Sequence, residues 1–470
     1  LHVAFVPHFE SLRKESPQKA ARFFHDLSAG LTLILLLLTF IGEGILGSFL
    51  LFGDLEPGNV EIIRLTMVLM PALLFISLYA LNTSLLNCER SYFLPSVAPV
   101  ALNLIWIGAV LFLYRRTTPE AMLYLSMVLV FAFAAQWLVT VPRVYRFLAT
   151  TLGPKWWLQK EKMGREILRI FRPFLLALIG VTATQINSAL DAIFARSADP
   201  EGPALLWYAL RLQQLPLALF GVGLTGALLP PISRALEAGD RPRYLQFLAL
   251  AFRRVVTYMI PITAACFALG LVSVNLVYGR GEFSQAATYT TSRCLWAYGA
   301  GLVPMTLVLI LAAAFYAHKE YRIPSLISVA TVLLNIGLNS LFVYGFHLGA
   351  ISVALATTLT SCVNVAALFY FLMKKEGGLE KIPFLKVAGC SLFAIAITIT
   401  LSSWLFHDNT LSSLLGRPLY PFPRHFLTQL GTFGAETLLF ATTFLLSARL
   451  LKIEEFRFNV RSVFNFKRVS

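Results

Sequence analysis

The main shortage in this 470-residue chain is charge. Charged residues make up 13% of it and hydrophobic residues 57%, whereas a soluble domain averages about 25% charged and 45–50% apolar residues. Acidic residues are the scarcer kind, with 24 against 39 basic residues. This composition excludes an ordinary soluble domain and indicates a chain whose side chains mostly face lipid.

Cysteine and the common catalytic motifs are also scarce. The five cysteines form no CxxC pair and lie in or beside apolar segments, which argues against a zinc site or a redox dithiol. The chain has no Walker motif, no HExxH and no GxSxG, so neither ATP hydrolysis nor these enzyme classes are expected. Any work that such a chain performs would therefore draw on the membrane potential or an ion gradient.

Long apolar runs dominate what is present. Twelve runs are each long enough to cross about 30 Å of hydrocarbon as a helix. They are continuously apolar rather than alternating, which favours helices over a barrel. The predicted spans are 27–52, 62–87, 96–114, 121–142, 167–195, 204–228, 250–278, 291–317, 324–346, 349–373, 384–406 and 426–450. The expected fold class is therefore an all-α polytopic membrane protein.

The basic residues lie in the gaps between these runs rather than in one stripe, which argues against a nucleic-acid partner. One set of alternate connections carries 24 basic residues and the other set carries 6. Because positive loops stay in the cytoplasm, the first set is assigned to that side. Both ends of this chain are then cytoplasmic, as an even number of spans requires.

Two short matches suggest an internal repeat. Residues 4–8 (AFVPH) resemble 227–231 (ALLPP), and residues 91–96 (SYFLPS) resemble 320–325 (EYRIPS). Both pairs fall between spans in the same order, which predicts two six-helix bundles of parallel orientation plus a final helix pair. The second bundle has two helices before its match that the first lacks, so about two N-terminal helices are expected to be missing from this chain.

These observations predict five regions. They are an N-terminal lobe with four spans at 1–142, a cytoplasmic linker at 143–166, a C-terminal lobe with six spans at 167–373, a terminal helix pair at 374–451 and a basic cytoplasmic tail at 452–470.

Several motifs resemble those of one transporter family. The chain reads WYALR at 207–211, LP at 215–216, FGV at 220–222, LP at 229–230, SR at 233–234 and GD at 239–240. This pattern is similar to the signature of the MurJ/MviN lipid II flippases, and the turn at 278–283 (YGRGEF) resembles one of that family. The resemblance covers about residues 1–375.

The resemblance implies a function and partners. The family belongs to a superfamily with MATE drug exporters and moves an undecaprenyl-diphosphate-linked peptidoglycan precursor from the inner to the outer leaflet of the cell inner membrane. It implies two lobes with alternating access, a cationic cavity for the headgroup and a groove for the lipid tail at the terminal helix pair. Expected partners are that precursor and the lipid bilayer, with cell-wall synthesis proteins as candidates.

Arg211 is the sharpest candidate residue. It lies inside an apolar run, where an arginine without a partner costs a few kcal/mol. A guanidinium binds a diphosphate bidentately, and the resemblance implies that role here. The alternative is that Arg211 reaches the outer interface. Gln214 stands where many family members carry an acid, and Pro216 would kink the helix as a pivot.

A second group of polar residues lies on other spans. Gln185 and Asp191 share one helix face with Ser188, which suggests a cavity lining or a helix contact. The resemblance implies a sodium site formed by four oxygen donors, Asp191, Asn335, Asn339 and Thr357. Ordinary hydrogen bonding between helices is the competing interpretation, and no other cofactor is expected.

Two further functions remain open at this stage. One is a related exporter of drugs, cations or lipid-linked polysaccharide units, although such drug antiporters usually stop at twelve spans. The other is a membrane enzyme acting on polyprenyl phosphates, which would need acidic metal-binding pairs. The one adjacent acidic pair in the sequence, Glu454–Glu455, lies in a basic tail.

Overall fold

A computed structural model gives the fold. The structure describes residues 2–54, 56–113, 119–153, 185–223, 231–232, 234–236, 238–318, 320, 322–376, 384–405, 410, 421–453 and 456. All regular secondary structure in these ranges is helical. The chain divides into two compact units, unit 1 (Leu1–Gly180) and unit 2 (Val181–Ser470).

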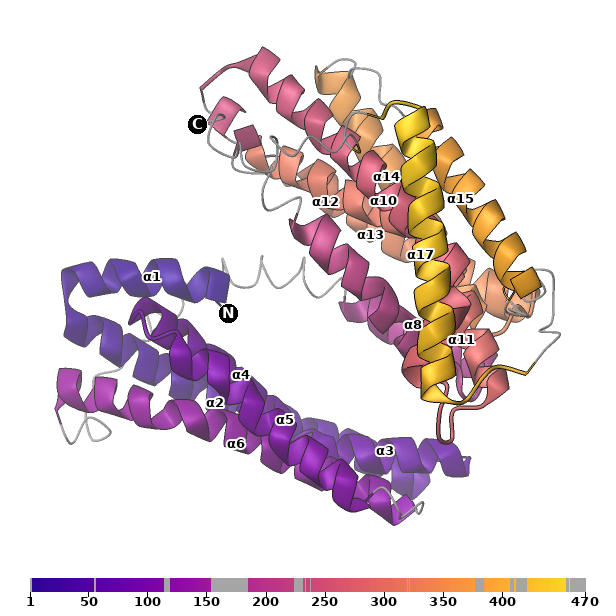
Figure 1. Ribbon diagram of the computed structural model, residues 1–470. Coiled ribbons are helices and arrows are strands. Elements are labelled where there is room, and N and C mark those ends of the chain that lie inside the picture. Colours follow the sequence, from indigo (N-terminus) through magenta and orange to yellow (C-terminus); the bar gives the residue numbers. More distant parts are fainter. Residues whose placement is uncertain are drawn as a thin grey trace. The chain divides into compact units, whose positions relative to one another are not determined.

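Unit 1 contains six described helices, α1 to α6 (Figure 1). They are α1 (His2–Glu15), α2 (Pro17–Phe52), α3 (Pro57–Leu69), α4 (Ala72–Cys88), α5 (Phe93–Leu113) and α6 (Pro119–Leu152). Pro17 and Pro57 begin their helices, where the missing N–H costs nothing because the first turn has no partner for it. Pro71 separates α3 from α4.

The core of unit 1 lies where α1, α2 and α4 meet. Phe5, Phe9, Phe23 and Phe24 are almost fully buried there, and the Phe5 ring centroid lies 5.1 Å from that of Phe9 and 6.0 Å from that of Phe23. The rest of α2 is apolar and exposed, as with Phe40 at 80%. A helix that is apolar on every side and not covered by protein suits a lipid surface.

Unit 2 begins with a helix at 185–198 and continues with the remaining elements. They are α8 (Gly202–Pro216), the π-helix η2 (Leu217–Val222), α10 (Arg241–Tyr278), α11 (Gln285–Ala300), α12 (Leu302–Ala317), α13 (Arg322–Ser340), the π-helix η3 (Leu341–Gly345), α14 (Ile351–Glu376), α15 (Phe384–Leu405) and α17 (Phe426–Leu450). Asp240 and Ser284 cap α10 and α11, with their side chains accepting from the backbone N–H of Arg243 and Ala287, which satisfies donors that a helix start leaves open.

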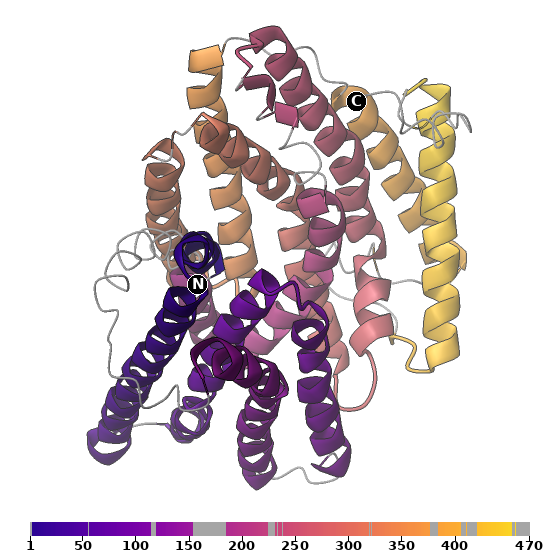
Figure 2. The same ribbon diagram turned by 90° about the vertical axis from the view of Figure 1, so that its left-hand side faces the viewer.

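The terminal helices α15 and α17 pack against each other and against α10 (Figures 1 and 2). Small residues on α10 and α15, such as Ala268 and Ala394, face Phe440 and Phe444 of α17 in one buried cluster. The Gln429 side chain of α17 donates to the carbonyl oxygens of Gly279 and Pro423, each at 2.9 Å. Packing along the helices and the hydrogen bond from Gln429 to Gly279, at the end of α10, hold the pair to the rest of unit 2.

Within the described residues, ten helical stretches are long and apolar enough to cross a membrane, with α3–α4 and α11–α12 each counted as one stretch. They confirm ten of the twelve predicted spans. The predicted span 204–228 corresponds to α8 and η2 as far as Gly223, and 224–230 lie outside the described residues. The predicted span 167–195 is described from residue 185 onward, where it is helical.

The helices extend beyond several predicted spans. α2 begins at Pro17 rather than at residue 27, because its first turns bury Ala20, Ala21, Phe23 and Phe24 against α1. α6 continues to Leu152, through the first part of the predicted linker, and the linker from 154 onward lies outside the described residues. Of the predicted tail, only 452–453 and 456 are described.

The two units repeat one order of elements. α2, the broken pair α3–α4, α5 and α6 in unit 1 follow the same sequence as α10, the broken pair α11–α12, α13 and α14 in unit 2. The break falls at Pro71 in the first pair and at Gly301 in the second. This order agrees with the repeat expected from the matching segments.

Candidate functional site

Arg211 lies on an exposed face of α8. Its guanidinium carbon is 4.6 Å from the ring centroid of Trp207, one turn earlier, and its Nη1 donates to Oε1 of Gln214 at 3.3 Å. Trp207 is itself 52% exposed. The indole face attracts the cation and the amide orients it, so most of the five guanidinium N–H groups remain available to an anion.

The opposite face of α8 fixes this orientation. Gln213 is 2% exposed, and its Nε2 donates to the carbonyl oxygen of Tyr298 on α11 at 3.2 Å. Ala209 is fully buried beside it. At the start of α8, a Cβ at Gly202 would collide with the carbonyl oxygen of Ala195, so a glycine there permits the tight turn from the preceding helix.

Asp191 lies at the centre of a network from three helices. Asn339 Nδ2 of α13 donates to Asp191 Oδ1 at 2.9 Å and to Asn335 Oδ1 at 2.8 Å. Thr357 Oγ1 of α14 donates to Asp191 Oδ2 at 3.4 Å. Asn187, which lies on the same helix as Asp191, donates from its Nδ2 to that oxygen at 3.1 Å. The structure thus brings together the four residues expected to hold sodium.

The oxygens of this network fit a hard cation in part. Asn335 and Asn339 are 2% and 0% exposed, and the side-chain carbonyl oxygen of Asn339 is buried with no hydrogen-bond partner among the residues that the structure describes. An orphaned buried acceptor beside a carboxylate is what a cation would satisfy. Rotation of the Asn339 amide presents either its oxygen or its NH₂ group toward Asp191.

Gln185 stands apart from both groups. Its side chain is exposed at the first described residue of the helix at 185–198, and Asn187, not Gln185, contacts the Asp191 carboxylate. The contact of Trp207 with Arg211 and that of Asn187 with Asp191 were not expected from the sequence. Their spacing of four residues, which places two side chains on one helix face, is the signal that could have indicated them.

The fold consists of membrane-spanning helices in two repeated units. The Arg211 side chain and the Asp191 network are set into apolar helices. These features define a multi-pass membrane transporter. A family model described as lipid II flippase MurJ matches residues 1–415. This chain belongs to that family. It is a transporter rather than an enzyme.

Individual relatives agree with the family model. A protein of Chlamydia pneumoniae described as "Probable lipid II flippase MurJ" is 33% identical over 464 residues, covering 97% of this chain and 83% of that protein. The "Lipid II flippase MurJ" of Burkholderia cenocepacia is 28% identical over 322 residues, covering 67% of this chain and 60% of that protein.

Solved structures share the fold. A lipid II flippase MurJ in an inward closed conformation superposes with a TM-score of 0.72 at 21% identity, covering 96% of this chain and 88% of that one. An inward-facing multidrug resistance MATE family transporter gives a TM-score of 0.66 at 14% identity, covering 80% and 86%. At these identities the likeness concerns the fold alone, so the MATE match does not favour drug export over lipid II transport.

Proposed function

We propose that this protein carries a lipid-linked peptidoglycan precursor from the inner to the outer leaflet of the cell inner membrane, with Arg211 contacting its diphosphate. Family membership supports the substrate class. Arg211 is the observation that carries the assignment of the site, because its guanidinium is held over Trp207 on an exposed face of a mostly apolar helix. Proteins that consume the precursor are expected partners.

The guanidinium suits a diphosphate for two reasons. It stays charged at any physiological pH, and its planar N–H groups match two phosphate oxygens at once. In surroundings poor in water, that pairing is stronger than it would be in solution. Gln213 keeps the other face of α8 against α11, so binding an anion need not disturb the packing of unit 2.

A change of access requires α8 to alter its direction. Pro216 ends α8, and the π-helix η2 follows at once. Proline and π-helical turns are two of the identified causes of helix bending. We infer that the segment from Pro216 to Val222 is the pivot through which Arg211 is presented to each side of the membrane in turn.

The orientation is part of the proposal. The connections richest in basic residues face the cytoplasm, which places both ends of this chain there. The end of unit 2 where α10 begins and α14 ends carries Arg241, Arg243, Lys374 and Lys375, and it is therefore assigned to the cytoplasmic side.

Replacing Arg211 tests the site. We expect Arg211→Ala to reduce translocation of the precursor in proteoliposomes at least about tenfold, because a charge-assisted hydrogen bond contributes roughly 1.5–3 kcal/mol. Arg211→Lys should recover part of the activity, since lysine keeps the charge but loses the bidentate geometry. The matched control is Arg280→Ala, because Arg280 is also exposed and lies 5.3 Å from an aromatic ring, that of Phe426. Normal translocation by Arg211→Ala would refute the assignment.

We also propose that a sodium ion binds at the Asp191 network. Asp191, Asn335, Asn339 and Thr357 would hold it through their oxygens. A bound cation would neutralise the carboxylate and order three helices, so its release would loosen their packing. The buried side-chain carbonyl oxygen of Asn339, which has no partner within the described part of the chain, supports this assignment.

Sodium binding is tested by stability rather than by transport. We expect the purified protein to be stabilised by about 1.4 kcal/mol when sodium is tenfold above its dissociation constant, and potassium at equal ionic strength to be less effective. Asp191→Asn should abolish the difference between the two ions. Asp199→Asn is the matched control, because Asp199 lies just beyond the same helix and its Oδ1 accepts from the backbone N–H of Glu201 in its own turn, away from the Asp191 network. Equal unfolding temperatures in sodium and potassium for the unmodified protein would refute the ion site.

A further inference from the structure

A polar pocket lies where α10 begins and α14 ends, within unit 2. Its volume is about 330 Å³, and its lining residues are Leu236, Gly239, Arg241, Tyr244, Lys375 and Glu376. None of the residues assigned above to the diphosphate or to sodium lines it. Its chemistry therefore needs an explanation of its own.

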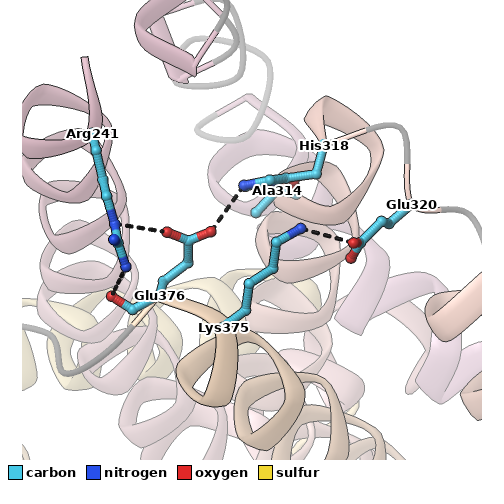
Figure 3. A network of polar contacts seen from close by, with 6 residues as sticks. All are labelled: Arg241, Ala314, His318, Glu320, Lys375 and Glu376. Atoms are coloured by element: carbon cyan, nitrogen blue, oxygen red, sulfur yellow. Dashed lines mark hydrogen bonds and ion pairs between the residues drawn. The ribbon is translucent and has the colours of Figure 1, made fainter. Parts of the chain in front are cut away.

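Three of the lining residues, Arg241, Lys375 and Glu376, belong to a network of polar contacts (Figure 3). The Glu376 carboxylate lies between Arg241 and His318, with Oε2 at 3.5 Å from Nε of Arg241 and Oε1 at 2.9 Å from Nε2 of His318. Arg241 Nη2 also donates to the Glu376 carbonyl oxygen at 3.1 Å. Beside them, Lys375 Nζ donates to Glu320 Oε1 at 2.8 Å.

His318 joins the network to the end of α12. Its Nδ1 lies 2.9 Å from the carbonyl oxygen of Ala314, and its Nε2 lies 2.9 Å from Oε1 of Glu376. The charged residues that line the pocket are Arg241, Lys375 and Glu376. The lining therefore carries two basic side chains and one acidic side chain, and the acidic one is already in contact with Arg241 and His318.

The pocket also has more donors than acceptors. Arg241 has five N–H groups and Lys375 has three, and the contacts above use only some of them. The Tyr244 side chain is fully buried, and its hydroxyl has no hydrogen-bond partner among the described residues. Both carboxylate oxygens of Glu376 are already in contact with nitrogen atoms of Arg241 and His318. A compact anion with several acceptor oxygens would satisfy this surplus.

We propose that this pocket binds a phosphate group, supplied by an anionic phospholipid headgroup or by soluble phosphate. The start of α10 is already capped by the Asp240 side chain, so the ligand is recognised by Arg241, Lys375 and Tyr244 rather than by the helix terminus. Basic pockets between membrane helices are known to hold anionic headgroups. The proposed orientation places the pocket at the cytoplasmic leaflet. The chemistry of the pocket does not depend on that orientation.

Binding is tested with the full chain, purified in detergent and freed of lipid. Phosphatidylglycerol, phosphatidylcholine and inorganic phosphate are added separately, and bound molecules are counted by native mass spectrometry. We expect phosphatidylglycerol to bind more tightly than phosphatidylcholine. If inorganic phosphate competes with phosphatidylglycerol at equal concentration, the pocket recognises the phosphate alone and soluble phosphate is the source. If it does not compete, the lipid is the source.

Variants link the binding to this pocket. Arg241→Gln combined with Lys375→Gln should weaken phosphatidylglycerol binding at least about tenfold. Tyr244→Phe, which removes one hydroxyl and keeps the ring, should weaken it about threefold to tenfold. The matched controls are Arg243→Gln and Lys374→Gln, because these exposed basic residues lie on the same two helices but do not line the pocket.

Two outcomes would overturn the proposal. One is unchanged binding by both the double variant and Tyr244→Phe. The other is an equal loss in the test and control variants, which would indicate attraction to surface charge in general. Arg211→Ala serves as a cross-check, because it should stop translocation and leave this binding intact. Failure of the phosphate site and failure of the proposed transport site are therefore distinguishable.

Discussion

The two units follow the same order of helices. The start of α2 in unit 1 corresponds to the start of α10 in unit 2, but different kinds of side chain pack at these two places. In unit 1, α1 and the start of α2 meet α4 through four stacked or edge-on phenylalanine rings. In unit 2, the start of α10 meets α12 and α14 through Arg241, His318 and Glu376, with the Tyr244 ring 5.2 Å from that of His318. One topology is thus closed by aromatic packing in one copy and by polar contacts around the buried Glu376 in the other.

The same contrast extends along the spans. In the described part of unit 1, a buried hydrogen bond joins Asn82 on α4 to Thr140 on α6 at 2.9 Å. Unit 2 sets Asp191, Asn335 and Asn339 into one network. Buried polar groups in a membrane protein are costly unless they have partners, and they usually mark function. In the described parts of the chain, the buried polar network of unit 2 therefore joins more side chains than the Asn82–Thr140 pair of unit 1.

The largest expected effect tests the aromatic end of unit 1. We expect Phe23→Ala to lower the free energy of unfolding by about 3–5 kcal/mol, because it leaves a cavity among rings that are fully buried. Phe40→Ala, on the same helix but 80% exposed, should cost far less. Thermal unfolding in detergent compares them. Similar losses for both variants would show that the aromatic cluster is not what closes unit 1.

A somewhat smaller effect is expected at the charged end of unit 2. Glu376 is 8% exposed, and Glu376→Ala should cost about 3 kcal/mol because Arg241 and His318 lose the anion between them. In unit 1, Arg13 pairs with Glu89 at 3.2 Å, with the side chains 39% and 24% exposed. Glu89→Ala should therefore cost less than about 1 kcal/mol, and higher salt should reduce it further. A loss at Glu89 as large as that at Glu376 would remove the distinction between the two ends.

The smallest effect compares one buried asparagine in each unit. Asn339→Ala should cost about 1–2 kcal/mol, because it removes hydrogen bonds to both Asp191 and Asn335, whereas Asn82→Ala should cost about 0.6 kcal/mol, the average for one bond between membrane helices. Unfolding midpoints of the two variants, measured in the same detergent, give the ranking. The reverse order would mean that the polar network of unit 2 contributes little to its stability.

The spans could be predicted because an apolar run of about 20 residues matches the thickness of the hydrocarbon layer when it forms a helix. The helix ends could not, because hydropathy marks where hydrocarbon lies rather than where a helix stops. α2 therefore begins at Pro17, within a polar stretch whose alanines and phenylalanines pack on α1. The internal breaks at Pro71 and Gly301 fall inside runs that read as continuous, because neither residue interrupts the apolar pattern.

The candidate site was only partly predictable. Asp191 and Asn339 could be paired through the family resemblance, although they are far apart in the sequence and meet through the packing of three helices. The Glu376 network gave no comparable signal. In the sequence, a single acid after two lysines at the end of a span resembles a solvated helix terminus. Glu376 is buried because α12 packs on α14 and α10 packs on α12, and these contacts exist only in the folded unit.

The π-helical segments η2 and η3 have a consequence for anyone who aligns or redesigns these helices. A π-turn holds more residues than an α-turn, and each extra residue rotates everything after it by about 100° around the axis. A helical wheel drawn from Arg211 into η2, or from Asn339 into η3, therefore assigns the side chains at the end of each π-helix to the wrong face. These two places are also where a one-residue insertion or deletion between relatives can be absorbed without shifting the flanking helix.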